Sequence, residues 1–199
     1  MIALIDYKAG NLTSVRKALA TIGADVFVPD APGDLADAAG IIVPGVGHFG
    51  ATRALDQLWI EAILARVGEG RPLFGICLGM QWLFEGSEEA PDLPGLGLLS
   101  GRCYRLTTDP PLKVPHVGWN SLEIQREGGL LDQVADGSQV YFTHSYVAPV
   151  NGDTRAETRH GGTFAAVVQR GHIGGVQFHP EKSGDVGLRI LRNFVELAG

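Results

Sequence analysis

Short apolar runs alternate with segments of helical periodicity through the first half of the chain. Four of these runs predict buried strands, at residues 2–6, 25–29, 40–45 and 72–77. Between them, apolar side chains recur every three or four residues over 12–22 and 51–67, which predicts two amphipathic helices. A short helix is expected directly after the fourth strand, over 78–86. This alternation favours a parallel sheet covered by helices on both faces.

The second half of the chain has a different pattern. Strand-like pieces separated by short turns lie at residues 103–107, 121–125, 139–150, 154–158 and 163–180. Arg170-Gly171 is typical of a hairpin tip, and residues 184–199 carry an apolar stripe that predicts a closing helix. We therefore expect a single α/β domain over residues 1–199. Its mostly parallel central sheet would be flanked by helices, with an antiparallel β extension in the C-terminal half.

Composition excludes several classes of protein. The formal net charge is −6 and no basic run is present, which argues against nucleic acid or an anionic membrane surface as the main partner. No apolar stretch approaches the ~20 residues of a bilayer span, and the first residues lack the positive leader of a signal peptide. The two cysteines, Cys77 and Cys103, are too few for a disulfide framework. A cytoplasmic protein is the simplest expectation.

Cys77 lies where the fourth strand is predicted to end and a helix to begin. Gly75 and Gly79 stand two residues before and two after it, as a nucleophile elbow requires where strand and helix backbones pass closely. The positive end of the helix dipole would stabilise a thiolate there. The backbone N–H of Leu78 would point at a developing oxyanion. The alternative is an inert core cysteine, since free cysteine is often buried.

His179 is the strongest candidate for a base to activate this thiol. Pro180 biases His179 toward an extended conformation, in which His179 and Glu181 face the same way. A carboxylate beside an imidazole fixes its tautomer and stabilises its protonated form. The alternative is a surface His–Glu pair at the end of a strand.

The remaining histidines are weaker candidates. His144 and His116 compete as the base, but neither has a carboxylate at a fixed short spacing. His48 is expected on a loop surface, and no role is assigned to His160 or His172. No spacing typical of a metal site is present, so no metal is expected.

The glycine-rich loop at residues 44–47, "PGVG", ends the third predicted strand. Open α/β sheets bind ligands at the carboxyl ends of their strands. Two glycines around Val46 would let a peptide plane rotate at low cost, so this loop could supply a second oxyanion donor. By itself the loop is also compatible with an ordinary turn.

Together, "GICLGMQ" (75–81), "QFHPE" (177–181) and "PGVG" (44–47) resemble the class I, or triad, glutamine amidotransferases. Within that class the chain is similar to the family of glutaminase subunits of imidazole glycerol phosphate synthase. The pieces "IDYKAGNLTSV", "PHVGWN", "YFTHSY" and "QFHPEKS" carry this closer resemblance along nearly the whole chain. Lys8 and Thr143 depart from the family pattern, and neither lies in the expected triad.

The resemblance implies glutamine hydrolysis by a triad of Cys77, His179 and Glu181 without a cofactor. It assigns the oxyanion hole to Leu78 and to the glycine-rich loop, through Val46 or Gly47. Further positions follow by similarity: Gln81, His144, Ser145 and Tyr146 for glutamine, and Asn11, Tyr141 and Lys182 for a partner interface.

The implied partner is a (β/α)₈ cyclase subunit in a one-to-one heterodimer. Ammonia would pass to a ribonucleotide intermediate, yielding imidazole glycerol phosphate and an aminoimidazole carboxamide ribonucleotide in histidine biosynthesis. Three alternatives stay open. They are a glutaminase subunit of another synthase, a stand-alone cysteine hydrolase of peptides or γ-glutamyl compounds, and a non-catalytic binding module. Cys103 is expected to be a packing residue.

Overall fold

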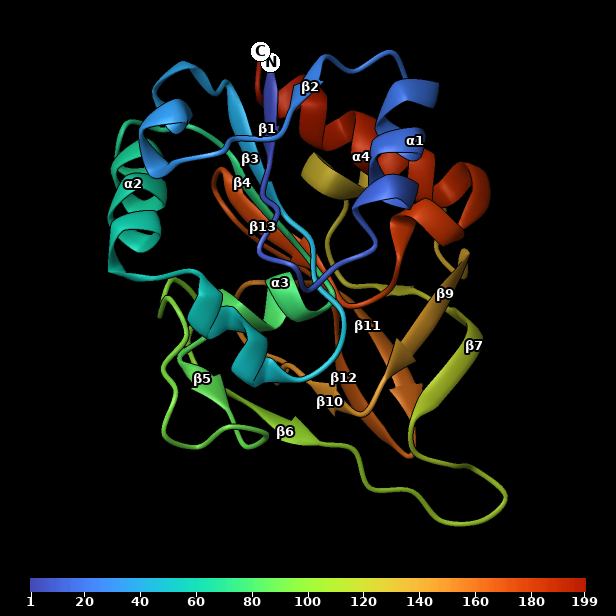
Figure 1. Cartoon of the computed structure of the whole chain (residues 1–199). Coiled ribbons are helices and arrows are strands. Elements are labelled where there is room, and N and C mark those ends of the chain that lie inside the picture. Colours follow the sequence, from blue (N-terminus) through green and yellow to red (C-terminus); the bar gives the residue numbers. More distant parts are fainter.

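The centre of the molecule is an eight-stranded sheet in the order β2-β1-β3-β4-β13-β12-β11-β8 (Figure 1). It is seen in a computed structural model that describes all residues from 1 to 199. The sheet strands are β1 (Ile2–Leu4), β2 (Val26–Phe27), β3 (Gly40–Val43), β4 (Leu73–Ile76), β8 (Glu123–Ile124), β11 (Thr154–His160), β12 (Gly162–Arg170) and β13 (Ile173–Val176). Strands β2, β1, β3, β4 and β13 run parallel, and β12, β11 and β8 continue the sheet in antiparallel fashion.

Helices cover both faces of the parallel part. The α-helices are α1 (Leu12–Thr21), α2 (Gln57–Gly68), α3 (Leu78–Trp82) and α4 (Gly184–Leu197). Short 3₁₀ turns are η1 (Pro32–Asp37), η2 (Phe49–Ala54), η3 (Gly129–Leu131) and η4 (Pro180–Lys182). In Figure 1, α1 and α4 lie together on one side of the sheet, and α2 and α3 lie on the other.

The alternation of side chains along β1 explains why helices cover both faces of the sheet. Ile2 and Leu4 belong to a core of 25 buried residues that includes side chains of α1 and α4. Ala3 and Ile5 belong to a second core of 23 buried residues with side chains of α2 and α3. Because neighbouring side chains of a strand point to opposite faces, a fully apolar run must be covered on both sides.

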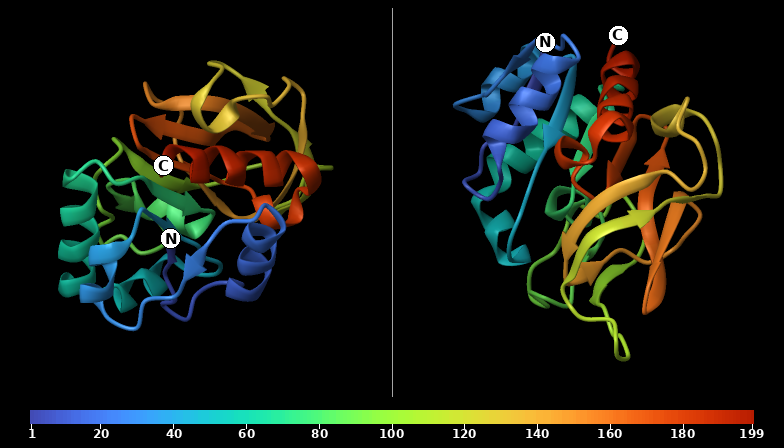
Figure 2. Two further views of the ribbon diagram at one scale, coloured as in Figure 1. Left: turned by 90° about the horizontal axis from the view of Figure 1, so that it is seen from above. Right: turned by 90° about the vertical axis from the view of Figure 1, so that its right-hand side faces the viewer.

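The antiparallel extension stands beside the parallel part, as the right-hand view of Figure 2 shows. It includes the pair β7 (His116–Ser121) and β9 (Gln139–His144), and a small sheet of β5 (Gly86–Ser87), β6 (Arg102–Arg105) and β10 (Tyr146–Val147). The predicted class is confirmed: a mostly parallel, helix-flanked sheet with an antiparallel extension. None of the helices is both long and apolar enough to cross a bilayer.

Several predicted boundaries are wrong. The helix expected over 51–67 begins at Gln57, because the Asp56 side chain accepts hydrogen bonds from Leu58 N and Trp59 N and caps it there. The expected strand over 139–150 is divided between β9 and β10, which belong to different sheets.

Two further differences between prediction and structure concern the strand β7 and a hairpin tip. The strand β7 was not predicted, since Gly118 and the preceding proline interrupt its apolar pattern. The hairpin tip lies one residue later than predicted, at Gly171-His172, because Arg170 still pairs with Ile173.

Candidate active site

Cys77 occupies a strained turn between β4 and α3, with φ 53° and ψ −106°. A side chain at Gly79 would place its Cβ 1.8 Å from the Val43 carbonyl oxygen, and one at Gly75 would lie 2.5 Å from Met80 N. Only glycine leaves room for the strand and helix at these two positions. The strain therefore falls on the cysteine, as in a nucleophile elbow.

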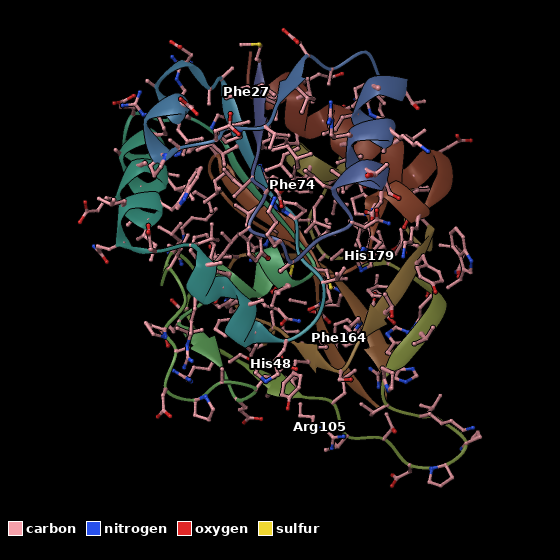
Figure 3. All side chains as sticks on the ribbon, viewed as in Figure 1. Phe27, His48, Phe74, Arg105, Phe164 and His179 are labelled. Carbon is pink, nitrogen blue, oxygen red and sulfur yellow. The ribbon has the colours of Figure 1, made fainter.

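His179 and Glu181 lie beside Cys77, on the segment that follows β13. His179 Nδ1 is 2.8 Å from Glu181 Oε1, and the two side chains are only 2% and 1% exposed. His179 is extended as predicted, whereas Glu181 lies in the 3₁₀ turn η4, because Pro180 starts a turn closed by Lys182 N to His179 O. Figure 3 shows His179 in the interior of the molecule, well apart from His48.

The second nitrogen of the His179 ring makes no hydrogen bond within the protein. His179 Nε2 is buried and has no hydrogen-bond partner within bonding distance. Burial alone would lower the pKa of His179, but the neighbouring Cys77 sulfur and Glu181 carboxylate outweigh burial and raise it. The protonated form of His179 is therefore favoured.

Ser183 fixes the His179 segment to β9. Its hydroxyl donates to the His179 carbonyl at 2.6 Å and accepts from Tyr141 N at 3.0 Å. His179 N in turn donates to the Tyr141 carbonyl at 2.9 Å. Three hydrogen bonds therefore couple the backbone of the candidate base to Tyr141.

The backbone donors of the expected oxyanion hole are occupied. Leu78 N donates to the Gly45 carbonyl at 3.3 Å, and Val46 N donates to the Ala9 carbonyl at 2.8 Å. Gly47 has φ +94° and lines the cavity next to Cys77. In this conformation the Gly45 carbonyl takes the hydrogen bond that a substrate oxyanion would need.

A cavity of about 270 Å³ opens onto Cys77. It is lined by all four residues expected to bind glutamine, which are Gln81, His144, Ser145 and Tyr146, and by Leu78 and Gly47 of the expected oxyanion hole. Val46, His179 and Glu181 are not among its lining residues. It is also lined by Glu89, Pro115 and Thr143, which the sequence did not single out as site residues. Glu89 follows β5 and accepts a hydrogen bond from Phe49 N at 2.7 Å. No periodicity or spacing predicts that placement, because Glu89 reaches the cavity through a loop.

His144 lines the cavity, and the buried His116 lies directly behind it. His116 Nδ1 is 3.2 Å from His144 Nε2, and His144 Nδ1 is 3.2 Å from the Tyr146 carbonyl, which can only accept. Burial, with repulsion from neighbouring imidazoles, lowers the pKa of His144 to about 3 and that of His116 to about 4. His160 stacks on His116 at 4.1 Å between ring centroids. Neither competitor as base carries a carboxylate partner.

This neutral pair predicts a loss of stability in acid. Unfolded histidine titrates near ~6.5, so below that pH the unfolded chain binds more protons than the folded one. The contribution of the two histidines to the free energy of unfolding should therefore be fully present above pH ~6.5. The free energy of unfolding should fall by up to about 3 kcal/mol between pH 7 and pH 5. Urea unfolding at the two pH values measures this. The double variant His116→Gln/His144→Gln should flatten the dependence, and an unchanged slope in that variant would contradict the assignment.

Two of the three expected interface residues, Tyr141 and Lys182, contact each other. Lys182 Nζ lies 5.7 Å from the centre of the Tyr141 ring, and Trp119 packs edge-on against the same ring at 6.0 Å. Asn11 instead caps α1, accepting a hydrogen bond from Ser14 N at 3.3 Å. Trp119 and Val117 are each 57% exposed, which leaves an apolar surface next to Tyr141.

The chain is similar to known proteins over nearly its whole length. Residues 3–197 match the family described as glutamine amidotransferase class-I. The imidazole glycerol phosphate synthase subunit HisH of Gloeobacter violaceus is 49% identical over 203 residues, with 99% of this chain and 89% of that protein covered. The subunit HisH of Methanothermobacter thermautotrophicus is 44% identical over 198 residues, with 99% and 98% covered.

Solved structures agree on the fold. A crystal structure of a glutamine amidotransferase superposes with a TM-score of 0.78 at 23% identity and covers 100% of both chains. The resemblance drawn from the sequence motifs is confirmed by the curated relatives. The chain therefore belongs to the class-I glutamine amidotransferases and, within them, to the HisH family of imidazole glycerol phosphate synthase subunits, enzymes of histidine biosynthesis.

Proposed function

We propose that this chain hydrolyses glutamine to glutamate and ammonia through Cys77, His179 and Glu181. One observation carries the proposal: a cysteine in a strained elbow lies beside a buried imidazole whose Nδ1 is 2.8 Å from a carboxylate. Such a sulfur–imidazole–carboxylate arrangement activates a thiol for attack on an amide.

The reaction proceeds in two halves. The Cys77 sulfur adds to the side-chain amide carbon of glutamine, and His179 gives its proton to the departing ammonia, leaving a γ-glutamyl thioester. A water molecule then loses a proton to His179 and adds to the thioester carbon. Glutamate leaves and the thiol is restored. Glu181 orients the imidazole and stabilises its protonated form throughout.

The oxyanion hole requires a change at Gly45-Val46. The Gly45 carbonyl and the Val46 N–H belong to one peptide plane, and each now makes an internal hydrogen bond, to Leu78 N and to the Ala9 carbonyl. A rotation of that single plane would free Leu78 N–H and present Val46 N–H to the same space. The rotation changes ψ of Gly45 and φ of Val46, and its conformational cost is lowered at Gly45, which has no Cβ.

Glu89 and Gln81 would hold the amino-acid end of the substrate. Glu89 is the only Asp, Glu, Lys or Arg residue that lines the cavity, so it suits the α-ammonium group of glutamine. His144, Ser145 and Tyr146 also line the cavity, and the family resemblance implies that their backbone groups bind glutamine.

The ammonia would be consumed by a (β/α)₈ cyclase subunit bound one-to-one. Released into water at neutral pH, ammonia would become unreactive ammonium, so the chemistry favours a sealed interface. The relatives named as synthase subunits support such a partner. The exposed Trp119 and Val117, with Tyr141 and Lys182 beside them, form a surface that a partner could cover.

The blocked oxyanion donors predict that the isolated chain is a slow glutaminase. Adding the cyclase subunit with its ribonucleotide substrate should raise kcat for glutamate release by about 10²-fold or more, the effect of gaining one oxyanion donor or two. Glutamate release with and without the partner measures this. Full turnover by the isolated, unliganded chain would refute the requirement for rotation and would favour a stand-alone hydrolase.

A further inference from the structure

Gln177 is a fully buried amide that makes contact with the candidate nucleophile. It lies between β13 and His179, and its side chain is inaccessible to solvent. Gln177 Nε2 is 3.6 Å from the Cys77 sulfur, and Gln177 Oε1 accepts from Gln81 Nε2 at 3.1 Å. Both polar atoms of the amide therefore contact residues of the site.

The orientation of this amide is determined by a backbone carbonyl. Gln81 Nε2 donates to the Tyr146 carbonyl at 2.8 Å as well as to Gln177 Oε1. A carbonyl can only accept, so Gln81 must direct its NH₂ group inward. Gln177 must then offer its oxygen to Gln81, which leaves its NH₂ group on the sulfur side.

The Tyr146 carbonyl also orients the rings of His144 and His116. It lies 3.2 Å from His144 Nδ1, whose ring reaches His116 at 3.2 Å. Because an acceptor-only carbonyl requires a donor, His144 carries its proton on Nδ1 and accepts through Nε2. One carbonyl thus sets the direction of hydrogen bonds toward both Cys77 and His116.

A packing role alone does not explain a glutamine here. An amide buried without access to water is unfavourable unless its polar atoms are bonded, and an apolar side chain of similar volume would fill the space without that requirement. The bonds of this amide lead to the sulfur and to the cavity wall. A donor next to sulfur favours thiolate over thiol, because the charged acceptor makes the stronger hydrogen bond.

We propose that Gln177 is a further catalytic residue, whose N–H group stabilises the Cys77 thiolate and holds the sulfur toward His179. This inference rests on the proposed glutaminase function. The same N–H would act twice in the cycle: before attack on glutamine, and when the thioester is hydrolysed and the sulfur leaves with its electron pair.

The test is the pH profile of Cys77 alkylation by iodoacetamide in Gln177→Met, measured on the full chain bound to its cyclase partner. Methionine keeps the length of the side chain and removes the donor. The midpoint of the rate–pH profile should move up by about one pH unit, and kcat/KM for glutamine should fall about tenfold or more. Gln177→Glu, which replaces the donor by a negative charge, should move the midpoint in the same direction and further.

Asn193→Leu is the matched control. Asn193 is another buried amide, but it bonds the Leu130 and Asp132 carbonyls instead of the sulfur. It should leave the alkylation midpoint unchanged even if the protein is less stable. If Gln177→Met does not fold, the folded Gln177→Glu protein gives the same test. An unchanged midpoint in a folded Gln177 variant would overturn this inference, whereas an unreactive Cys77 in the parent protein would overturn the proposed function itself.

Discussion

Cys77→Ala should abolish glutamine-dependent synthesis by the assembled enzyme while synthesis from added ammonia survives. Loss of the sulfur removes covalent catalysis, and a drop of about 10⁴-fold or more in glutamine-dependent kcat is expected. The ammonia-dependent reaction should stay near its parent rate, because the cyclase would perform that chemistry without the triad. Product formation from each nitrogen source, with the cyclase and its ribonucleotide, measures both.

Cys103→Ala is the natural control for this experiment. Cys103 is fully buried away from the cavity, and its sulfur lies 3.8 Å from the Gln81 carbonyl oxygen. Both reactions should survive in that variant. If Cys77→Ala loses both activities, the role assigned to Cys77 is wrong, since a change confined to the glutaminase centre cannot stop the use of external ammonia.

Gly79→Ala should have the largest effect on folding. Its added Cβ would lie 1.8 Å from the Val43 carbonyl oxygen, and that oxygen belongs to the backbone of β3. Neither strand nor helix can move without disturbing the elbow. We expect the free energy of unfolding to fall by about 3 kcal/mol or more, with loss of glutaminase activity. Urea unfolding followed by circular dichroism measures the change.

Gly33→Ala provides the comparison. Nothing lies within 4 Å of a Cβ at Gly33, and its backbone is not in the left-handed region. Alanine there should be neutral or slightly stabilising. Equal stability of the Gly79→Ala and parent proteins would show that the elbow is looser than these distances require.

Much of the fold and of the site could be predicted because local physics determines it. Apolar runs buried on both faces identify the parallel strands, and glycines around a cysteine indicate a turn that no other residue permits. Pro180 likewise limits the backbone of His179, which is extended as predicted. Glu181 does lie beside the imidazole, but it reaches it from the turn η4 and not from an extended segment. Each of these features can be predicted from a few residues that are neighbours in the sequence.

Other features depend on segments distant in the sequence. Val46 N is bonded to Ala9 and Leu78 N to Gly45, and no pattern in the glycine-rich loop predicts that both donors are occupied. Glu89 lines the cavity of Cys77 from a position 12 residues away, and Gln177 contacts the sulfur from 100 residues away. The start of α2 was mispredicted because a capping aspartate outweighed an apolar stripe that partly faces solvent.

The most direct test of the poised sulfur is covalent labelling by an electrophilic diazoketone analogue of glutamine, located by peptide mass spectrometry. We expect one label per chain, on Cys77 alone, with protection by glutamine and much slower labelling in His179→Asn. Glutamine-dependent activity should be lost in proportion to the labelling. An enzyme that loses this activity while labelled elsewhere, or that turns glutamine over with Cys77 untouched by the analogue, would contradict it.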